Sequence, residues 1–290
     1  MAGKNERQRR QAREKYRRQQ EQRRARQQKI RKRWLIGGSA FMAALLIVSL
    51  LLVFLPGSSP KKAAAKPSKS PSATATATAV AEPAHHCDYT SATPTAKKVG
   101  LPAATPDFTG SYQATINTNL GKLTFNLLNS KATCTVNSFV HLAQAGYFDN
   151  TQCHRLLTSG IYVLQCGDPY AAADAKLSCS TTSKIGTGTP GYDFASENLT
   201  GAKYPTGTVA MANEGTANSN GSQFFIVYKD STSGLNGSTG PSYTPFATVS
   251  SGLGIVQNVA KDGYSCQYAQ AGGGVPKKKV IIDSVTIKKT

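Results

Sequence analysis

One apolar segment constrains this chain more than any other feature. Residues 34–55 form an uncharged run of 22 residues. At a helical rise of about 1.5 Å per residue, such a run can cross a hydrocarbon layer of about 30 Å. A basic triplet, residues 31–33, precedes it directly, and basic flanks stay on the cytoplasmic side of a membrane. We therefore expect a transmembrane helix at 34–55, a basic cytoplasmic tail at 1–33 and an exported remainder.

A cleaved signal peptide is the alternative interpretation of the same run. The apolar core of a signal peptide is usually about 7–15 residues long, and a site with small residues follows it. Here the run is longer and ends in Phe54-Leu55-Pro56. An uncleaved anchor is favoured, so the expected location is the cell membrane, with a single pass and an extracytoplasmic C-terminal domain.

The positive charge is concentrated at the N-terminus. The chain has 34 basic and 15 acidic residues, a net charge of +19. Residues 1–33 contain 15 basic and 3 acidic side chains, whereas residues 107–290 contain 13 and 10. The high charge therefore does not indicate a nucleic-acid-binding fold. The tail could contact anionic lipid or nucleic acid, but a solvated determinant of membrane topology is the favoured interpretation.

The composition changes again after the apolar run. Residues 56–106 are rich in Pro, Ala, Ser, Thr and Lys and include the segment ATATATA. So few large apolar residues cannot form a core, which predicts a flexible spacer. The remaining residues, 107–290, are numerous enough to form one folded domain.

All six cysteines lie beyond the apolar run, which favours disulfide bonds in an exported domain. Six cysteines allow fifteen pairings. Closeness in sequence weakly favours Cys134 with Cys153, and a Cys179–Cys266 bond would join two surface loops. The chain has no C-x-x-C, and His85-His86-Cys87 has no second ligand cluster. We therefore expect no metal site.

The sequence of the exported domain predicts mainly β-strands. Short apolar runs at 112–116 and 120–127 predict a hairpin, and further strands are predicted at 161–165, 208–212, 223–228 and 280–287. Helical periodicity predicts helices at 133–145, with Thr133 as N-cap, and at 253–261. Many strands and two helices suggest a closed antiparallel barrel with helical lids. Periodicity alone does not distinguish a barrel from a sandwich.

Two segments carry a more specific signal. They are HRLLTSGIYVLQCGDP at 154–169 and GTVAMANEG at 207–215, the latter continued by SNGSQFFI at 219–226. Together with 186–199 and 243–249, they resemble the signature blocks of cyclophilin-type peptidyl-prolyl isomerases over about residues 110–288. The resemblance implies a mainly β fold, a closed eight-stranded antiparallel barrel capped by two α-helices. It also implies cis–trans isomerisation of X-Pro bonds, without a cofactor. With the predicted anchor, the expected substrates are proline-containing segments of unfolded or exported proteins, whose folding the domain would assist at the outer face of the membrane.

The resemblance also assigns roles to individual residues. Arg155 matches the catalytic arginine, whose guanidinium is always charged and presents a rigid set of donors. Gln165 matches the glutamine that orients it. The positions that match substrate contacts are Tyr162, Val163 and Phe225 on the floor of the proline pocket, Ala212, Asn213 and Glu214 along the peptide, Gln223 as a further contact, Tyr243 at the pocket edge and Gly186 at the rim.

The chain departs from the family pattern in several places. Two more residues than usual separate Arg155 from Gln165, and the usual Phe and Met of the pocket are Tyr162 and Val163. The chain's single tryptophan is Trp34, so the tryptophan that the family has at the pocket edge is missing. In the corresponding loop, Leu235 is the nearest apolar candidate for that position. Residues 170–185 look like an insertion. These differences leave an alternative open, a proline-peptide-binding module or chaperone with little turnover.

Overall fold

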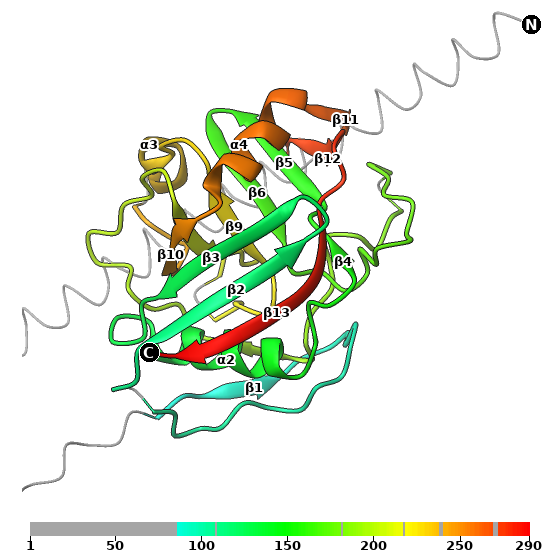
Figure 1. Ribbon diagram of the computed structural model, residues 1–290. Helices are drawn as coiled ribbons and strands as arrows, with labels where there is room; N and C mark the ends of the chain where they lie inside the picture. The colour runs from blue at the N-terminus through cyan, green and yellow to red at the C-terminus, as the bar shows by residue number, and fades with distance from the viewer. Residues whose placement is uncertain (1–85, 108, 181, 217, 238–239, 269–271) are drawn as a thin grey trace, which may run out of the picture. The chain divides into compact units, whose positions relative to one another are not determined.

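The computed structural model describes residues 86–107, 109–180, 182–216, 218–237, 240–268 and 272–290 (Figure 1). The predicted tail, the predicted transmembrane helix at 34–55 and the first part of the predicted spacer lie outside these residues. Within the described part of the chain, no helix combines the length and apolar character needed to cross a bilayer.

The described residues form a mainly β fold. One antiparallel sheet has the order β11-β12-β5-β6-β9-β8-β10-β3-β2-β13-β4, and β1 pairs with β7 in a second sheet. The strands are β1 Tyr89–Ser91, β2 Tyr112–Thr118, β3 Gly121–Leu127, β4 Thr151–Gln152, β5 Arg155–Ser159, β6 Ile161–Cys166, β7 Tyr192–Phe194, β8 Thr208–Met211, β9 Phe224–Val227, β10 Pro245–Ser251, β11 Tyr264–Gln267, β12 Gly274–Pro276 and β13 Ile281–Lys289.

The sheet differs from the expected closed barrel of eight strands. In the described part of the chain it has eleven strands and two ends, β11 and β4. The outer side of β5 is occupied by β12, and β11 pairs beyond it. No ladder among these strands therefore closes the sheet into a ring. The predicted hairpin is confirmed, because β2 and β3 pair from Tyr112↔Leu127 to Thr118↔Gly121.

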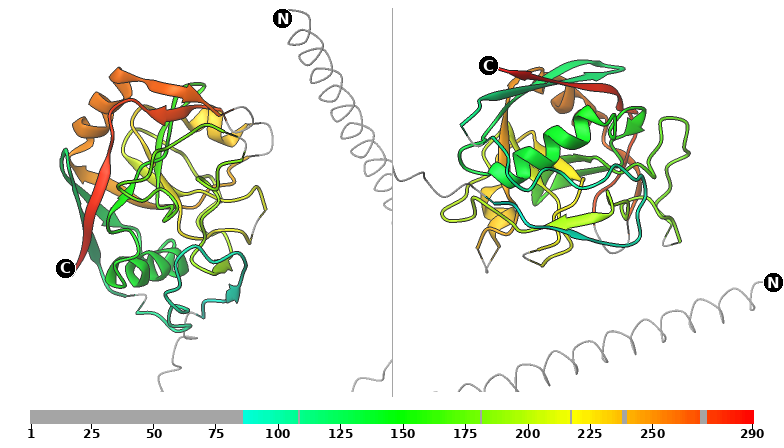
Figure 2. Two further views of the ribbon diagram at one scale, coloured as in Figure 1. Left: turned by 90° about the vertical axis from the view of Figure 1, so that its right-hand side faces the viewer. Right: turned by 90° about the horizontal axis from the view of Figure 1, so that it is seen from below.

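Two longer helices lie at opposite ends of the sheet, as expected (Figure 1 and Figure 2). They are α2, Thr133–Gln144, and α4, Leu253–Asp262, and a short third helix, α3, covers Thr232–Asn236. The predicted N-cap Thr133 is wrong, because Ala132 occupies that position. The carboxylate of Glu197 instead accepts the N–H groups of Cys134 at 3.1 Å and Thr135 at 2.7 Å, which stabilises the start of α2.

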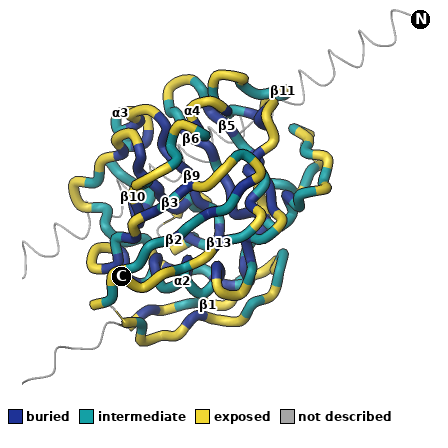
Figure 3. The backbone as a smooth tube through the Cα atoms, viewed as in Figure 1, coloured by how far each residue is buried: buried dark blue, intermediate teal, exposed yellow. Residues whose placement is uncertain are grey.

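Burial follows the strand alternation (Figure 3). In β2 and β3, every second side chain is buried, as expected for a sheet with one face on a core. Four of the six phenylalanine rings in the main core, Phe125, Phe139, Phe148 and Phe224, pack around one centre and are at most 2% exposed. Phe224 makes edge-to-face contacts with the other three, at centroid distances of 5.7–6.3 Å.

All six cysteines are paired, as Cys87–Cys134, Cys153–Cys166 and Cys179–Cys266. The expected Cys134–Cys153 bond is therefore wrong, whereas the suggested Cys179–Cys266 bond is confirmed. Closeness in sequence misleads here because Cys87, 47 residues before Cys134, is brought to α2 by the pairing of β1 with β7.

The last part of the predicted spacer differs from the expectation, because residues 86–106 pack on the folded domain. We call them the N-terminal strap. Within it, β1 pairs with β7 from Tyr89↔Phe194 to Ser91↔Tyr192. The Tyr89 hydroxyl donates to the carbonyl of Cys134 at 2.8 Å. One tyrosine and one disulfide thus fix a segment whose composition alone is that of a linker.

Candidate functional site

Strand alternation sorts the side chains of β5, β6, β9 and β8 onto two faces. Leu156, Leu164 and Phe224 belong to the main core. Their chain neighbours Leu157, Val163 and Phe225 belong to a second apolar cluster on the opposite face. Because successive side chains of a strand point to opposite faces, every second residue of these strands contributes to this second face.

An apolar floor lies on this second face. Phe225 is 4% exposed and Val163 is 3% exposed, and the ring of Tyr243 meets that of Phe225 edge to face at 5.4 Å. The floor is made by Leu157, Val163, Tyr204, Ala210, Phe225, Val227 and Leu235, with Ile161, Ala202, Ala212 and Tyr243 packed against it. The structure thus brings Val163, Phe225, Ala212 and Tyr243 together.

Tyr162 is the exception among the predicted floor residues. It packs against the main core, and its ring meets that of Tyr228 edge to face at 6.0 Å. It therefore lies on the other face of β6 from Val163, and the expectation that both line one pocket is wrong. Ile161 takes the place on the floor instead. Counting back in steps of two from Gln165 would have identified Ile161 from the sequence.

Arg155 begins a chain of hydrogen bonds beside this floor. Its Nη1 donates to Oε1 of Gln165 at 3.1 Å, and Nε2 of Gln165 donates to Oε1 of Gln223 at 2.9 Å. Nε2 of Gln223 in turn donates to the carbonyls of Gly186 and Gly188, each at 3.1 Å. In both Gln165 and Gln223, the amide oxygen accepts one hydrogen bond and the amide nitrogen donates. These bonds fix the orientation of each amide and of the guanidinium.

The longer spacing between Arg155 and Gln165 does not separate them. Arg155 pairs with Gln165 across the ladder of β5 and β6, and Ser159 pairs with Ile161 at the other end. The turn residue Gly160 has a φ of 74°, a conformation that suits glycine. The two arms have equal length on either side of it, so the extra residues lengthen the hairpin without changing its register at the arginine.

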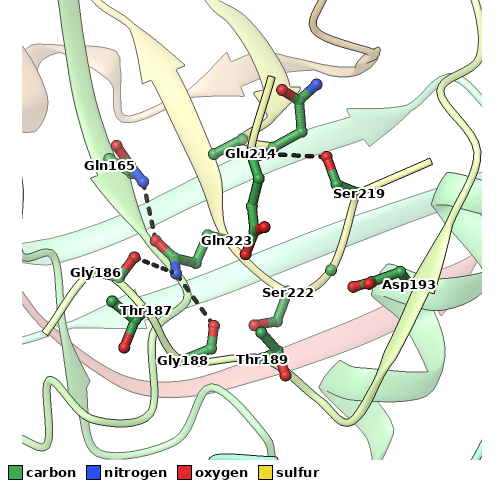
Figure 4. A pocket seen from close by; sticks show the side chains of 13 residues that line it. Gln165, Gly186, Thr187, Gly188, Thr189, Asp193, Glu214, Ser219, Ser222 and Gln223 are labelled. Carbon is green, nitrogen blue, oxygen red and sulfur yellow. Dashed lines mark hydrogen bonds between the residues drawn. The ribbon is translucent and has the colours of Figure 1, made fainter. Parts of the chain in front are cut away.

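A small polar pocket adjoins the chain of hydrogen bonds (Figure 4). Its cavity volume is about 90 Å³, and Gln165, Gln223, Ala212, Asn213 and Glu214 all line it. Asp193 also lines it. Burial, and then the negative charge of Glu214, raise the pKa of Asp193. The two carboxyl groups, Asp193 and Glu214, make the pocket acidic next to the arginine site.

Asp168 holds the loop that forms one wall of this pocket. Its carboxylate is fully buried and accepts the N–H groups of Gly186 and, at 2.8 Å, Tyr170. A Cβ at Gly188 would overlap the same carboxylate, so the close approach requires glycine there. Burial raises the pKa of Asp168, and the backbone N–H groups oppose this effect. No local sequence pattern indicates this role of Asp168.

His154 is fully buried beside Arg155, and the side chain of Gln223 interacts with its ring. Burial, and then the charge of Arg155, lower its pKa to about 3. The folded state therefore holds the neutral ring. The stabilisation from this preference is fully present above the unfolded pKa of about 6.5 and is lost as the pH falls towards 3.

We expect the free energy of unfolding to fall between pH 6.5 and pH 3 by up to about 1.4 kcal/mol per pH unit from this group. Denaturant unfolding at a series of pH values measures it. His154→Gln removes the titrating ring, so its curve should be flatter over this range, whereas other groups titrate equally in both proteins. Parallel curves for the two proteins would contradict the assignment.

The described residues contain no group of three or more His, Cys, Asp or Glu side chains that could hold a metal ion. The second face thus carries the hydrogen-bonded guanidinium of Arg155, an apolar floor and an adjoining polar pocket.

Comparison with known proteins identifies the family. The model of the cyclophilin type peptidyl-prolyl cis-trans isomerase/CLD family matches residues 113–287, so the chain belongs to this family. The probable peptidyl-prolyl cis-trans isomerase B of Mycobacterium leprae (strain TN) is 39% identical over 198 residues, which cover 63% of this chain and 59% of the relative.

Two further comparisons agree. The probable peptidyl-prolyl cis-trans isomerase B of Mycobacterium tuberculosis (strain CDC 1551 / Oshkosh) is 42% identical over 187 residues, covering 59% of this chain and 52% of the relative. The chain thus spans little more than half the length of these relatives. A crystal structure of a cyclophilin type peptidyl-prolyl cis-trans isomerase from Cryptosporidium parvum has 25% identity and a TM-score of 0.50, and the match covers 62% of this chain and 99% of that one.

Proposed function

We propose that this chain is a peptidyl-prolyl cis–trans isomerase whose active site is the face formed by Arg155, Gln165 and the apolar floor. The observation that carries the proposal is the bond from Nη1 of Arg155 to Oε1 of Gln165 at 3.1 Å, made beside the cluster that contains Val163 and Phe225. Family membership supports it.

The reaction explains why such a site is sufficient. The barrier of about 18–20 kcal/mol comes from amide resonance, and uncatalysed X-Pro isomerisation takes tens to hundreds of seconds. No bond breaks, so no nucleophile is needed. In the twisted transition state the prolyl nitrogen becomes pyramidal and gains a lone pair. The Arg155 guanidinium can donate to this nitrogen, while the apolar floor seats the proline ring, so the site favours the twisted amide over the planar one.

The proposal also includes where the enzyme acts and on which substrates. The uncharged run at 34–55 and its basic flank support a single-pass anchor with the isomerase domain on the outer side. Six paired cysteines support an oxidising compartment. The substrates would then be proline-containing segments of exported proteins, and catalysis would accelerate a slow step of their folding.

An NMR exchange assay on an X-Pro peptide tests the proposal with the purified chain of 290 residues. Such an assay measures both the binding of the peptide and the rate at which its isomers interconvert. Faster interconversion supports the isomerase. Peptide binding with an unchanged rate would contradict it and would favour the alternative, a proline-peptide-binding module or chaperone on the same fold.

The negatively charged pocket leads to a prediction about sequence preference. We expect peptides with Lys at one position within two residues of the proline to be turned over with a kcat/KM about three- to tenfold higher than peptides with Glu there, since partly exposed ion pairs contribute about 1 kcal/mol. The ratio should fall towards one in the double variant Asp193→Asn/Glu214→Gln and in high salt. Equal kcat/KM for both peptide series would contradict the prediction.

A further inference from the structure

The hairpin of β11 and β12 reaches the arginine of the proposed active site. The carbonyl of Gly272 accepts a hydrogen bond from Nε of Arg155 at 3.0 Å. The Tyr268 hydroxyl donates to the carbonyl of His154 at 3.1 Å, and the N–H of Tyr268 donates to the carbonyl of Gly273 at 2.9 Å. The end of this hairpin thus contacts both Arg155 and the residue that precedes it.

The sheet alone holds this hairpin weakly. In the described part of the chain, β11 pairs only with β12. The ladder between β12 and β5 consists of a single residue pair, Gly274↔Leu156. A two-stranded hairpin is marginally stable by itself. Its close approach also depends on glycine, because a Cβ at Gly273 would overlap the carbonyl of Leu156.

The disulfide Cys179–Cys266 supplies a second, covalent attachment. Cys266 lies in β11, and Cys179 lies in the insertion at 170–185, which leads directly into Gly186 and Gly188. The carbonyls of these glycines accept the hydrogen bonds of Gln223. The disulfide therefore joins the two loops that contact the hydrogen-bonded chain at its two ends, Arg155 at one and Gln223 at the other.

We propose that the Cys179–Cys266 disulfide and Tyr268 are positioning elements that hold the guanidinium of Arg155 through the β11–β12 hairpin. This inference rests on the proposed function, and it assigns to the insertion a role in orienting the arginine. Cross-linking also restricts the unfolded chain, whatever the position of the bond. A test must therefore measure the arginine itself as well as stability.

The test uses the ¹⁵N-labelled chain of 290 residues and its double variant Cys179→Ser/Cys266→Ser. The Nε–Hε signal of Arg155 is assigned by its loss in Arg155→Lys. A hydrogen bond to Gly272 protects Hε from exchange with water, so we expect its exchange rate to rise at least about fivefold in the double variant. We also expect kcat to fall about fivefold with KM changed less than twofold, because orientation acts on the twisted state.

The matched control is Cys87→Ser/Cys134→Ser, which removes a disulfide that lies between the N-terminal strap and α2. It should lower the melting temperature and leave the exchange of Arg155 Hε unchanged. Tyr268→Phe is a second variant, which keeps all three disulfides and the ring but removes the bond to His154. It should raise the Hε exchange rate in the same direction, by a smaller factor.

Unchanged Hε exchange in both Cys179→Ser/Cys266→Ser and Tyr268→Phe, with only a lower melting temperature in the former, would overturn the inference and leave the disulfide a purely stabilising bond. Failure of the proposed function is distinguishable, because it would appear as a wild-type protein with protected Hε and no isomerase activity. If the disulfide variant does not fold, Tyr268→Phe decides the question.

Discussion

Arg155→Ala should lower kcat/KM for an X-Pro peptide by about 100- to 1000-fold, the usual cost of removing one preorganised donor from a transition state. The guanidinium is already held by Gln165 at 3.1 Å and by the carbonyl of Gly272 at 3.0 Å, so no reorganisation is needed when the prolyl nitrogen gains its lone pair. Burial lowers the pKa of Arg155, but the group stays protonated at neutral pH.

Three companion variants make this result interpretable. Lys131→Ala removes an exposed positive charge far from the site in sequence and should leave kcat/KM unchanged. Arg155→Lys keeps the charge but loses the planar set of donors, so we expect only a partial recovery of activity. Gln165→Ala should lower kcat/KM less than Arg155→Ala does. Activity of Arg155→Ala within a few-fold of wild type would contradict the proposed role.

Phe224→Ala should lower the free energy of unfolding by about 3–5 kcal/mol, because it leaves a cavity in the main core. Phe224 is 1% exposed, and its ring makes edge-to-face contacts with Phe125, Phe139 and Phe148. Urea unfolding followed by circular dichroism measures the effect. A loss below about 1 kcal/mol would mean that these rings do not form the main core.

The neighbouring variant Phe225→Ala is the natural comparison. Phe225 lies on the opposite face of β9, where it forms part of the floor with Val163. We expect it to raise KM for X-Pro peptides, whereas Phe224→Ala should leave KM unchanged at temperatures where it remains folded. Equal effects of both variants on KM would contradict the assignment of the two residues to different faces.

Local chemistry accounts for what could be predicted from the sequence. The hairpin of β2 and β3 and the helices α2 and α4 follow from alternating or helical apolar patterns, which act over a few residues. The same alternation would have placed Ile161, and not Tyr162, beside Val163. For Tyr162, the resemblance to the family was followed in place of that alternation, and the structure agrees with the alternation.

The features that escaped prediction depend on contacts between distant parts of the chain. Glu197 caps α2 from more than sixty residues away, and Asp168 contacts the backbone of Gly186 across residues 170–185. Cys87 pairs with Cys134 because β1 joins β7. The composition of the N-terminal strap predicted a spacer. The few residues that attach the strap to the domain are too few to change its average composition.

The sequence by itself determined that a mainly β domain of the cyclophilin family follows an apolar run and a basic tail, and its resemblance to the family predicted a common site for Arg155, Gln165, Val163 and Phe225. Only the tertiary structure decided the disulfide pairing, the attachment of the N-terminal strap and the loop that holds the arginine. The physical reason is the separation in sequence between the residues that interact. Strand and helix patterns are written in neighbouring residues, whereas these contacts form only after the sheet has brought remote segments together.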